Sequence, residues 1–390
     1  MKSLVLFALS AIASASALAL TPIEIHGTLE QTTTVGSQTQ VNNTASPNST
    51  AIQNVSSNKG YVTLQSGLLK QTSTLGADSS QVRVENESKR AGDIAVQNVS
   101  SNYGTKTAAI LIERGTTKQE TNMSHGATLR NKAEGGGSNA NQHCTGNDCK
   151  NGAEAAQNVS SNAMDVTVKA DLTQQTSLKG GSVSNQALGK DAFAQQNLAS
   201  NAGKVTVGYG GLSQTVHLEY TNVSNTANSE AKAVQSLASN ANDVSTGGAK
   251  VEQTVSMGSA NISNSASSKD AAAVQNLASN YDGVRISASL KQTVDGSNGS
   301  ISNTANGSNA QAFQSLASNL GKVTISGATT QIAHVYGSVM NYAGTNAVAM
   351  QSMSSNDACE PPKLSTGPSC PTGGCGWTVA GGSGGGWGSH

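Results

Sequence analysis

The chain contains few aromatic and few charged side chains. Only 3% of its 390 residues are aromatic and 12% are charged, against about 25% charged residues in ordinary domains. The 23 basic and 23 acidic side chains cancel. Nucleic-acid binding needs clustered Lys and Arg against the phosphates, so this balance argues against a nucleic-acid partner. The scarcity of aromatic residues favours a core too thin for large rings.

Proline and apolar residues are also scarce. Of six prolines, only Pro47 lies within the repeats described below. Because proline lacks the N–H that a ladder needs, its absence fits continuous β-sheet. Apolar residues make up 36% of the chain, below the roughly 45–50% of globular domains. Asn, Gln, Ser, Thr, Gly and Ala take their place. Such a chain orders itself if amide side chains bond to one another and small residues pack closely.

Familiar catalytic motifs are missing as well. The sequence has no G-x-S-x-G elbow, no H-E-x-x-H and no phosphate-binding loop, and its six histidines do not recur at one repeat position. Carboxylates vary from copy to copy, whereas amides recur. We therefore expect no enzyme activity and no cofactor.

The first residues have the pattern of an export signal. Lys2 supplies a positive start, Leu4 to Ala19 form a short apolar stretch, and Ala17-Leu18-Ala19 matches an A-x-A cleavage site. The stretch is too short to favour a membrane anchor. We expect residues 1–19 to be a signal peptide and the protein to be secreted, either extracellular or attached to the outer cell surface.

Internal repetition dominates the rest of the chain. The phrase Q-[NS]-[VLM]-[AS]-S-N recurs at intervals of 44, 60, 39, 39, 40, 39 and 37 residues. A second Gln and a central Asn recur with it. The phrase begins at Gln53, Gln97, Gln157, Gln196, Gln235, Gln275, Gln314 and Gln351; the second Gln is Gln31, Gln71, Gln119, Gln175, Gln214, Gln253, Gln292 and Gln331; the central Asn is Asn43, Asn86, Asn131, Asn185, Asn225, Asn264, Asn303 and Asn341.

Local patterns favour strands within each repeat. Segments such as V-T-V and V-R-I-S alternate β-branched with polar residues, and bends such as Asp282-Gly283 separate them. The Ala-rich pieces, such as Ala271-Ala272-Ala273-Val274, are compatible with short helices, but we favour strands. The fold expected is all-β: a repetitive β-solenoid of parallel stacked rungs over residues 20–356, with Gln and Asn ladders. We expect about two rungs per 39-residue repeat, hence about sixteen rungs and a rod of roughly 75 Å.

Two segments depart from the repeat. The long spacing places an insertion at residues 134–153, where Cys144 and Cys149 are expected to close a small disulfide. The alternative is a metal site of His143, Cys144, Asp148 and Cys149, for which no second Cys/His pair exists. Residues 357–390 form an irregular tail rich in Pro and Gly, compatible with a cap, a docking peptide or a segment without a role. Cys359, Cys370 and Cys375 leave an odd cysteine for an intermolecular disulfide.

Recurring Gln and Asn with Ala, Ser and Gly spacers, behind a signal peptide, resemble the bacterial secreted functional amyloids with curlin-like or Fap-like repeats. The S-x5-Q-x-G-x4-N-x5-Q pattern of curlin repeats does not occur intact, and Cys370-x4-Cys375 is not the C-x-x-C of Fap-like subunits. The chain is also similar to holdfast-anchoring surface proteins of stalked bacteria. This resemblance implies self-association and an outer-membrane secretion or anchoring machinery as partner.

These observations favour a structural extracellular protein, a fibre subunit or surface anchor for adhesion and biofilm formation. The alternative is a monomeric β-solenoid that binds or cleaves surface polysaccharide. That alternative predicts a groove lined by aromatic or acidic side chains on consecutive rungs. A passenger adhesin is a third hypothesis, but no obvious membrane-barrel strand pattern follows the repeats.

Overall fold

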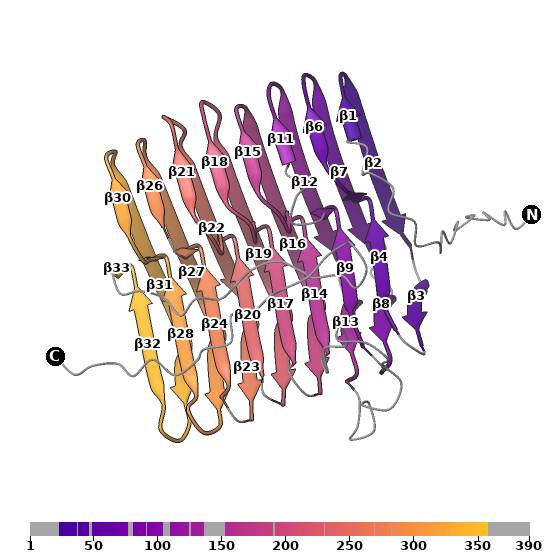
Figure 1. Ribbon diagram of the computed structural model, residues 1–390, viewed down its shortest axis with the longest axis vertical. Coiled ribbons are helices and arrows are strands. Elements are labelled where there is room, and N and C mark those ends of the chain that lie inside the picture. Colours follow the sequence, from indigo (N-terminus) through magenta and orange to yellow (C-terminus); the bar gives the residue numbers. More distant parts are fainter. Residues whose placement is uncertain are drawn as a thin grey trace, which may run out of the picture.

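The computed structural model describes residues 23–357, except 37, 47–48, 77–80, 91, 104–109, 125, 136–152, 190–191, 230, 269 and 282. The described residues form 33 β-strands and no helix. Every strand pairing among them is parallel, and equivalent strands of successive repeats lie side by side (Figure 1). The expected β-solenoid is therefore confirmed.

Each turn begins with a three-residue strand in an eight-stranded sheet, here called sheet I. These strands follow the V-T-V pattern, so their first and third residues point inward. The strands are β1 (Ile23–Ile25), β6 (Val62–Leu64), β11 (Ile110–Ile112), β15 (Val166–Val168), β18 (Val205–Val207), β21 (Val244–Thr246), β26 (Val284–Ile286) and β30 (Val323–Ile325).

The chain then reverses into a long sheet, sheet II, which backs the whole turn. In some turns one bent strand crosses this sheet, and in others it divides into two. The strands are β2 (Thr28–Val35), β3 (Gln40–Ala45), β7 (Leu68–Leu75), β8 (Val82–Ser88), β12 (Thr116–Met123), β13 (Ala127–Ala133), β16 (Asp171–Leu188), β19 (Leu212–Asn228), β22 (Val251–Gly258), β23 (Asn261–Ser267), β27 (Leu290–Asn306) and β31 (Thr329–Ala343).

A third sheet, sheet III, carries the chain back and ends at a corner with an Asn. The Ala-rich pieces belong to this sheet, so they are strands rather than helices. Its strands are β4 (Ala51–Val55), β9 (Ala95–Val99), β14 (Glu154–Val159), β17 (Phe193–Leu198), β20 (Lys232–Leu237), β24 (Ala272–Leu277), β28 (Gln311–Leu316) and β32 (Val348–Met353); the corner strands are β5 (Asn58–Lys59), β10 (Asn102–Tyr103), β25 (Asn280–Tyr281), β29 (Asn319–Leu320) and β33 (Asn356–Asp357).

One repeat makes one turn, so the expectation of two rungs per repeat was wrong. Gln214 pairs with Gln253, 39 residues later, and Asn225 pairs with Asn264 at the same interval. The two halves of a repeat lie in different sheets and do not stack on each other. A long strand, two shorter strands and their corners use all of the roughly forty residues in a single circuit.

The dimensions change accordingly. Eight strands at about 4.8 Å spacing give a stack of roughly 35 Å, not the rod of roughly 75 Å expected. A single strand such as Asp171–Leu188, with 18 residues at about 3.3 Å each, follows roughly 60 Å of chain. Figure 1 shows the strands running along the longest axis of the molecule and the turns stacked across it. One chain is thus a slab that is wider than the stack is tall.

The core is a thin layer on the inner side of sheet II. At one end of each turn, Val205 and Val207 of sheet I pack on Leu212 of sheet II. At the other end, sheet II packs on sheet III through larger residues such as Val223 and Leu237, and through a separate column of stacked alanines. Identical small residues above one another let the backbones of sheets II and III approach closely, which fits the scarcity of aromatic residues.

The [AS] position of the repeat phrase is a left-handed corner. Its eight members have φ between 47° and 50°: Ser56, Ser100, Ser160, Ala199, Ala238, Ala278, Ala317 and Ser354. Left-handed backbone disfavours bulky residues, and β-branched ones most of all. At the Ser100 corner the neighbour is polar, and the Ser100 hydroxyl donates to the Ser73 hydroxyl. At the Ala238 corner the neighbour is apolar, and Ala238 lies with Val216 in one apolar cluster. Backbone conformation and neighbouring side chains together explain the choice between Ala and Ser.

We predict that Ala238→Val lowers the free energy of unfolding by about 2–4 kcal/mol, because it adds a β-branched side chain at positive φ and overfills a closed core. Urea denaturation followed by circular dichroism measures the change. Ala238→Gly is the matched control, since glycine accepts this backbone conformation, and should stay within about 1 kcal/mol of the parent. Equal losses in both variants would contradict a conformational origin.

Candidate functional site

Four columns of amides run the length of the described stack, and the sequence singled out three of them. A shorter column, Asn54, Asn98, Asn158 and Asn197, joins only the first four turns. The first of the four lies in sheet II, where each Gln donates from Nε2 to Oε1 of the Gln in the preceding turn. The Gln214–Gln174 and Gln253–Gln214 distances are 3.1 and 3.0 Å. The same Nε2 atoms also reach the corner asparagines, as in Gln253 to Asn280 at 3.0 Å. The column consists of Gln31, Gln71, Gln119, Gln174, Gln214, Gln253, Gln292 and Gln331.

The second column is formed by the central asparagines of sheet II. Asn225 Nδ2 donates to Asn264 Oδ1 at 2.9 Å and to the backbone oxygens of Ala194 and Val234 at 3.1 and 3.0 Å. Ala194 and Val234 belong to sheet III, so each Asn joins two sheets and two turns. The column consists of Asn43, Asn86, Asn131, Asn185, Asn225, Asn264, Asn303 and Asn341.

The third column opens the repeat phrase in sheet III. Gln235 Nε2 donates to Gln196 Oε1 at 2.8 Å and to the Ser263 carbonyl of sheet II at 3.1 Å. Gln235 therefore joins sheet III to sheet II across the same interface as the central asparagines, but it donates from sheet III to sheet II. The column consists of Gln53, Gln97, Gln157, Gln196, Gln235, Gln275, Gln314 and Gln351.

The fourth column is the corner Asn that ends the phrase, with a serine column beside it. Asn201 Nδ2 donates to Asn240 Oδ1 at 2.9 Å. The serine before each Asn donates to the carbonyl two residues earlier and accepts from the next serine's N–H, as Ser200 does from Ser239 at 3.1 Å. The site residues predicted from the sequence include neither the corner asparagines nor these serines, although the S-N ending of the phrase marks both. The corner column consists of Asn58, Asn102, Asn162, Asn201, Asn240, Asn280, Asn319 and Asn356.

One assignment from the sequence is corrected. Gln174, not Gln175, occupies the sheet II column: it is fully buried and pairs with Gln119 and Gln214. Gln175 faces outward beside Glu120 and Thr215. Two adjacent glutamines satisfy the sequence pattern equally well, and only the register with the neighbouring turns decides which one points inward.

The remaining sequence candidates lie outside the described residues. These are the signal peptide, most of the insertion with His143, Cys144, Asp148 and Cys149, and the tail with Cys359, Cys370 and Cys375. Among the residues that the structure describes, no cluster of three His, Cys, Asp or Glu side chains could hold a metal ion. In the same residues no helix is long and apolar enough to cross a membrane.

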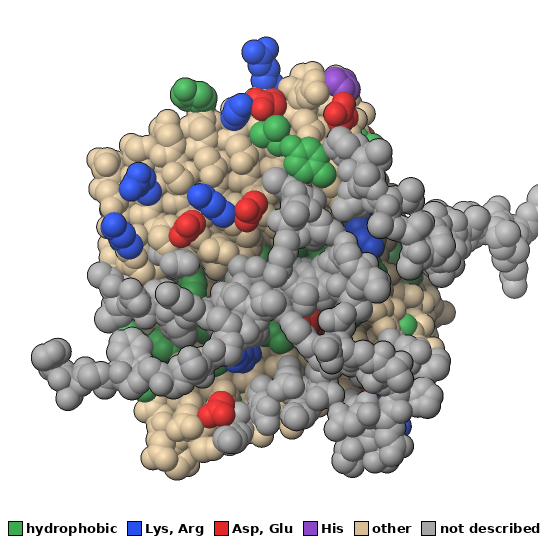
Figure 2. Space-filling model, viewed as in Figure 1, with side chains coloured by type: hydrophobic (Ala, Val, Ile, Leu, Met, Phe, Trp, Pro, Cys, Tyr) green, Lys and Arg blue, Asp and Glu red, His purple; other side chains and the backbone are tan. Residues whose placement is uncertain are grey.

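The face of the molecule shown in Figure 2 carries few described charged side chains, and they are mixed in sign. Ion pairs such as Lys169–Glu113 at 2.7 Å join neighbouring turns but are exposed, and exposed pairs contribute little. The exposed aromatics Tyr209, Tyr220, Tyr336 and Tyr342 occupy different positions of the repeat; Tyr336, for example, aligns with Ser297 and Tyr342 with Thr304. Within the described part of the chain, these aromatics do not line up on consecutive turns.

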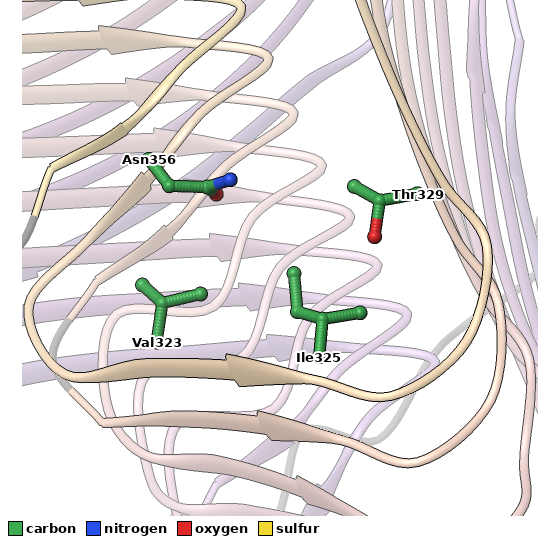
Figure 3. Close-up of a pocket in the computed structure, with 4 residues that line it drawn as sticks. All are labelled: Val323, Ile325, Thr329 and Asn356. Carbon is green, nitrogen blue, oxygen red and sulfur yellow. The ribbon is translucent and has the colours of Figure 1, made fainter.

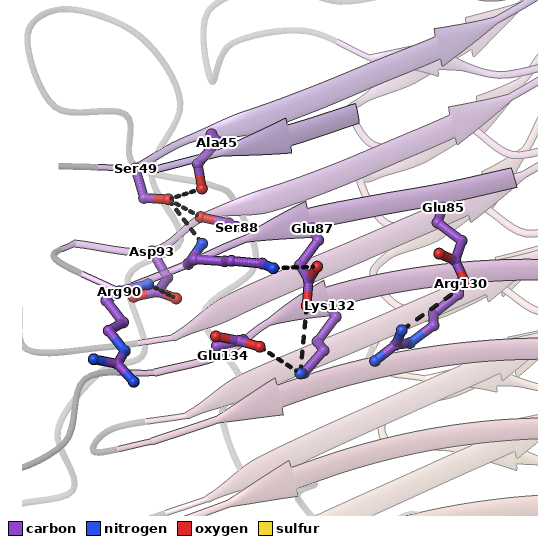
Figure 4. Close-up of polar contacts among 11 residues, drawn as sticks. Ala45, Ser49, Glu85, Glu87, Ser88, Arg90, Asp93, Arg130, Lys132 and Glu134 are labelled. Atoms are coloured by element: carbon purple, nitrogen blue, oxygen red, sulfur yellow. Dashed lines mark hydrogen bonds and ion pairs between the residues drawn. The ribbon is translucent and has the colours of Figure 1, made fainter. Parts of the chain in front are cut away.

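Asp93 is a buried carboxylate at the edge of the insertion (Figure 4). Its Oδ2 accepts from the backbone N–H groups of Arg90 and Gly135 at 2.8 and 3.0 Å. Burial raises the pKa of Asp93 above its ordinary value of 3.8, and these backbone hydrogen bonds oppose the rise only in part. The group ties the turn after β8 to the start of the insertion.

The two ends of the described stack leave core residues uncovered. In the last turn, Val323, Ile325, Thr329 and Asn356 line a cavity of about 430 Å³ that opens outward (Figure 3). Thr329 stands where Leu29, Leu69, Leu172, Leu212 and Leu290 stand in other turns. In the first turn, Ile23 and Leu29 are only half buried. Both ends also present strand edges without a neighbour among the described residues.

No family model, no curated protein and no solved structure matches this chain.

We predict that Asn225→Leu lowers the free energy of unfolding by about 2–4 kcal/mol, although the side chain keeps its approximate shape. The change leaves the Ala194 and Val234 carbonyls and the amides of Asn185 and Asn264 without their partner. The midpoint of urea denaturation measures the loss. Ser224→Ala, one residue away on the outer face, should change it by less than about 0.5 kcal/mol; a comparable effect there would refute the importance of the column.

We predict that Asp93→Asn is more stable than the parent at pH 7, because it removes a carboxylate whose burial disfavours ionisation. Because the pKa of Asp93 is raised in the folded state, protonated Asp93 stabilises the fold fully below about pH 4. This stabilisation is lost as the pH rises through the folded-state pKa. The advantage of the variant should therefore grow between pH 4 and pH 7. Urea denaturation at both pH values measures it, and a difference independent of pH would argue against this cause.

Proposed function

We propose that this chain is a structural extracellular protein, a fibre subunit or surface anchor used in adhesion and biofilm formation, which assembles through its stacked β-repeats. The observation that carries the proposal is that, among residues 23–357, no further turn or cap covers either end of the stack. A β-solenoid that acts as a monomer needs capped ends, because a bare terminal turn exposes unpaired strand edges. The first and last described turns instead keep the amide positions of the interior turns.

The composition supports the same function. Buried amide columns hold the turns in register. On the face shown in Figure 2 the charged side chains are few and mixed in sign, and the exposed tyrosines of the described residues do not line up on consecutive turns. Such a surface suits a building element. The pattern of an export signal at residues 1–19 supports an extracellular location, and the resemblance to secreted functional amyloids supports assembly by self-association with an export or anchoring machinery as partner.

We predict that the purified mature chain polymerises on incubation and that aligned fibres give reflections near 4.7–4.8 Å along the fibre axis and near 10 Å across it. Electron microscopy and fibre diffraction test this. The chain without residues 357–390 keeps all four amide columns and should polymerise as well. A stable monomer after prolonged incubation would contradict the proposal, and polymerisation only in the presence of residues 357–390 would assign assembly to the tail instead.

A further inference from the structure

The amide columns have a direction, and all eight turns share it. In both Gln columns, Nε2 donates toward the N-terminal end of the stack, as Gln253 does to Gln214 and Gln235 to Gln196. In both full-length Asn columns, Nδ2 donates toward the C-terminal end, as Asn225 does to Asn264. The direction does not reverse at any turn of the described stack. Each column is therefore a polar chain of hydrogen bonds whose two ends differ.

The N-terminal end presents one set of groups. Gln31 Nε2 donates to Asn58 Oδ1 within its own turn, but no preceding Gln among the described residues accepts from it. Gln53 Nε2 reaches only backbone carbonyls, those of Val41 and Glu85, at 3.4 and 3.3 Å. In the part of the chain that the structure describes, Asn43 Oδ1 has no Asn donor, whereas every later member of its column has one. This end therefore offers donors in the Gln columns and acceptors in the Asn columns.

The C-terminal end presents the complementary set. Gln331 and Gln351 donate to Gln292 and Gln314 of the preceding turn, and no Gln of a following turn donates to their Oε1 atoms within residues 23–357. Asn356 Oδ1 accepts from Asn319 and Gln331, and its Nδ2 has no Asn acceptor among the described residues. This end therefore offers acceptors in the Gln columns and donors in the Asn columns.

The apolar surfaces of the two ends match as well. Ile23 and Ile25 occupy the same columns of sheet I as Val323 and Ile325, which line the terminal cavity. Thr329 lines that cavity and belongs to a column with Leu at five of its eight positions and Thr117 and Val251 at two others; Leu29 of the first turn belongs to the same column. A first turn placed over the last turn would therefore put Ile23, Ile25 and Leu29 over a hollow with Val323 and Ile325 on its apolar side and Thr329 and Asn356 on its polar side.

We propose that a second copy of this chain docks head to tail on the C-terminal turn and continues all four columns in register, an inference that rests on the proposed assembly function. A head-to-head or tail-to-tail contact that overlaid like columns would place donor against donor or acceptor against acceptor in each of them. The contact is therefore heterologous and does not close, which is the geometry of a filament. The bonds across the junction run from Gln31 Nε2 to Gln331 Oε1, Gln53 Nε2 to Gln351 Oε1, Asn341 Nδ2 to Asn43 Oδ1 and Asn356 Nδ2 to Asn58 Oδ1.

Blocking one end at a time tests the polarity. Leu29→Lys places a charge on the inner face of the first turn, and Ile325→Lys does so in the last. Under reducing conditions each variant alone should remain monomeric, because each lacks one of the two required surfaces. An equimolar mixture should form a 1:1 dimer and no larger species, measured by analytical ultracentrifugation, since the mixture contains one intact surface of each kind.

The matched controls carry the same charge on the same strands but point outward. Thr28→Lys and Thr324→Lys are at exposed positions beside Leu29 and Ile325 and should polymerise as the parent does. Circular dichroism checks that all four variants keep the parent strand signal. Dimers of either blocked variant alone would indicate a symmetric contact and overturn the proposal. A mixture that stays monomeric, or blocked variants that still polymerise, would overturn it too, while polymers of the parent chain would leave the proposed function standing.

A second variant leaves the intrachain contacts intact. Asn356→Asp keeps Oδ1 as the acceptor from Asn319 and Gln331 but replaces the Nδ2 donor by an acceptor facing Asn58 Oδ1 of the next copy. The critical concentration for polymerisation at pH 7 should rise about tenfold. It should fall back toward the parent value below about pH 4, where the protonated carboxyl donates again. Asn346→Asp, exposed in the same turn, is the control; an equal rise there, or none in Asn356→Asp, would overturn the head-to-tail junction.

Discussion

The structure depends on hydrogen bonds between identical amide side chains stacked one turn above another. An amide has both a donor and an acceptor, so one residue type can pair with its own copy above and below without any change of sequence. Because these amides are buried, a member without its partner would cost more than an exposed one. This requirement fixes the register of every turn, and the strand pairing, the left-handed corners and the alanine column all follow the same period.

The same interactions compensate for a small apolar core. Val, Leu, Ile and Ala fill only thin layers between the sheets, and the amides occupy the space between these layers. Asn225 and Gln235 bond across sheets II and III from opposite sides. The polar interior therefore contributes cohesion along the stack and across it. A chain with 36% apolar residues can fold in this way because each buried polar group in the columns has a partner in the next turn.

Stacking also connects fold and assembly. Interior turns satisfy their amides on both sides, whereas the first and last described turns satisfy them on one side only. Because each column runs in one direction, a column that lacks an acceptor for its donor at one end lacks a donor for its acceptor at the other end. The two ends are therefore complementary. Because each turn stacks on the preceding turn in the same way, a further turn would stack on the last turn with the same geometry. The same hydrogen bonds that stabilise one chain would then join two chains.

The sequence by itself determined the period, the β-solenoid class and nearly all members of three amide columns, because a buried amide must recur once in every turn at the same position. Local pattern could not decide how many turns a repeat makes. A repeat of 39 residues suggested two turns, but its two halves lie in different sheets, and only pairing such as Gln214 with Gln253 shows that each repeat makes one turn. It could not choose between Gln174 and Gln175 either, since adjacent strand residues differ only in the face that they present. The tertiary structure decided both, because register between turns sets which side chains face inward and which way every amide donates.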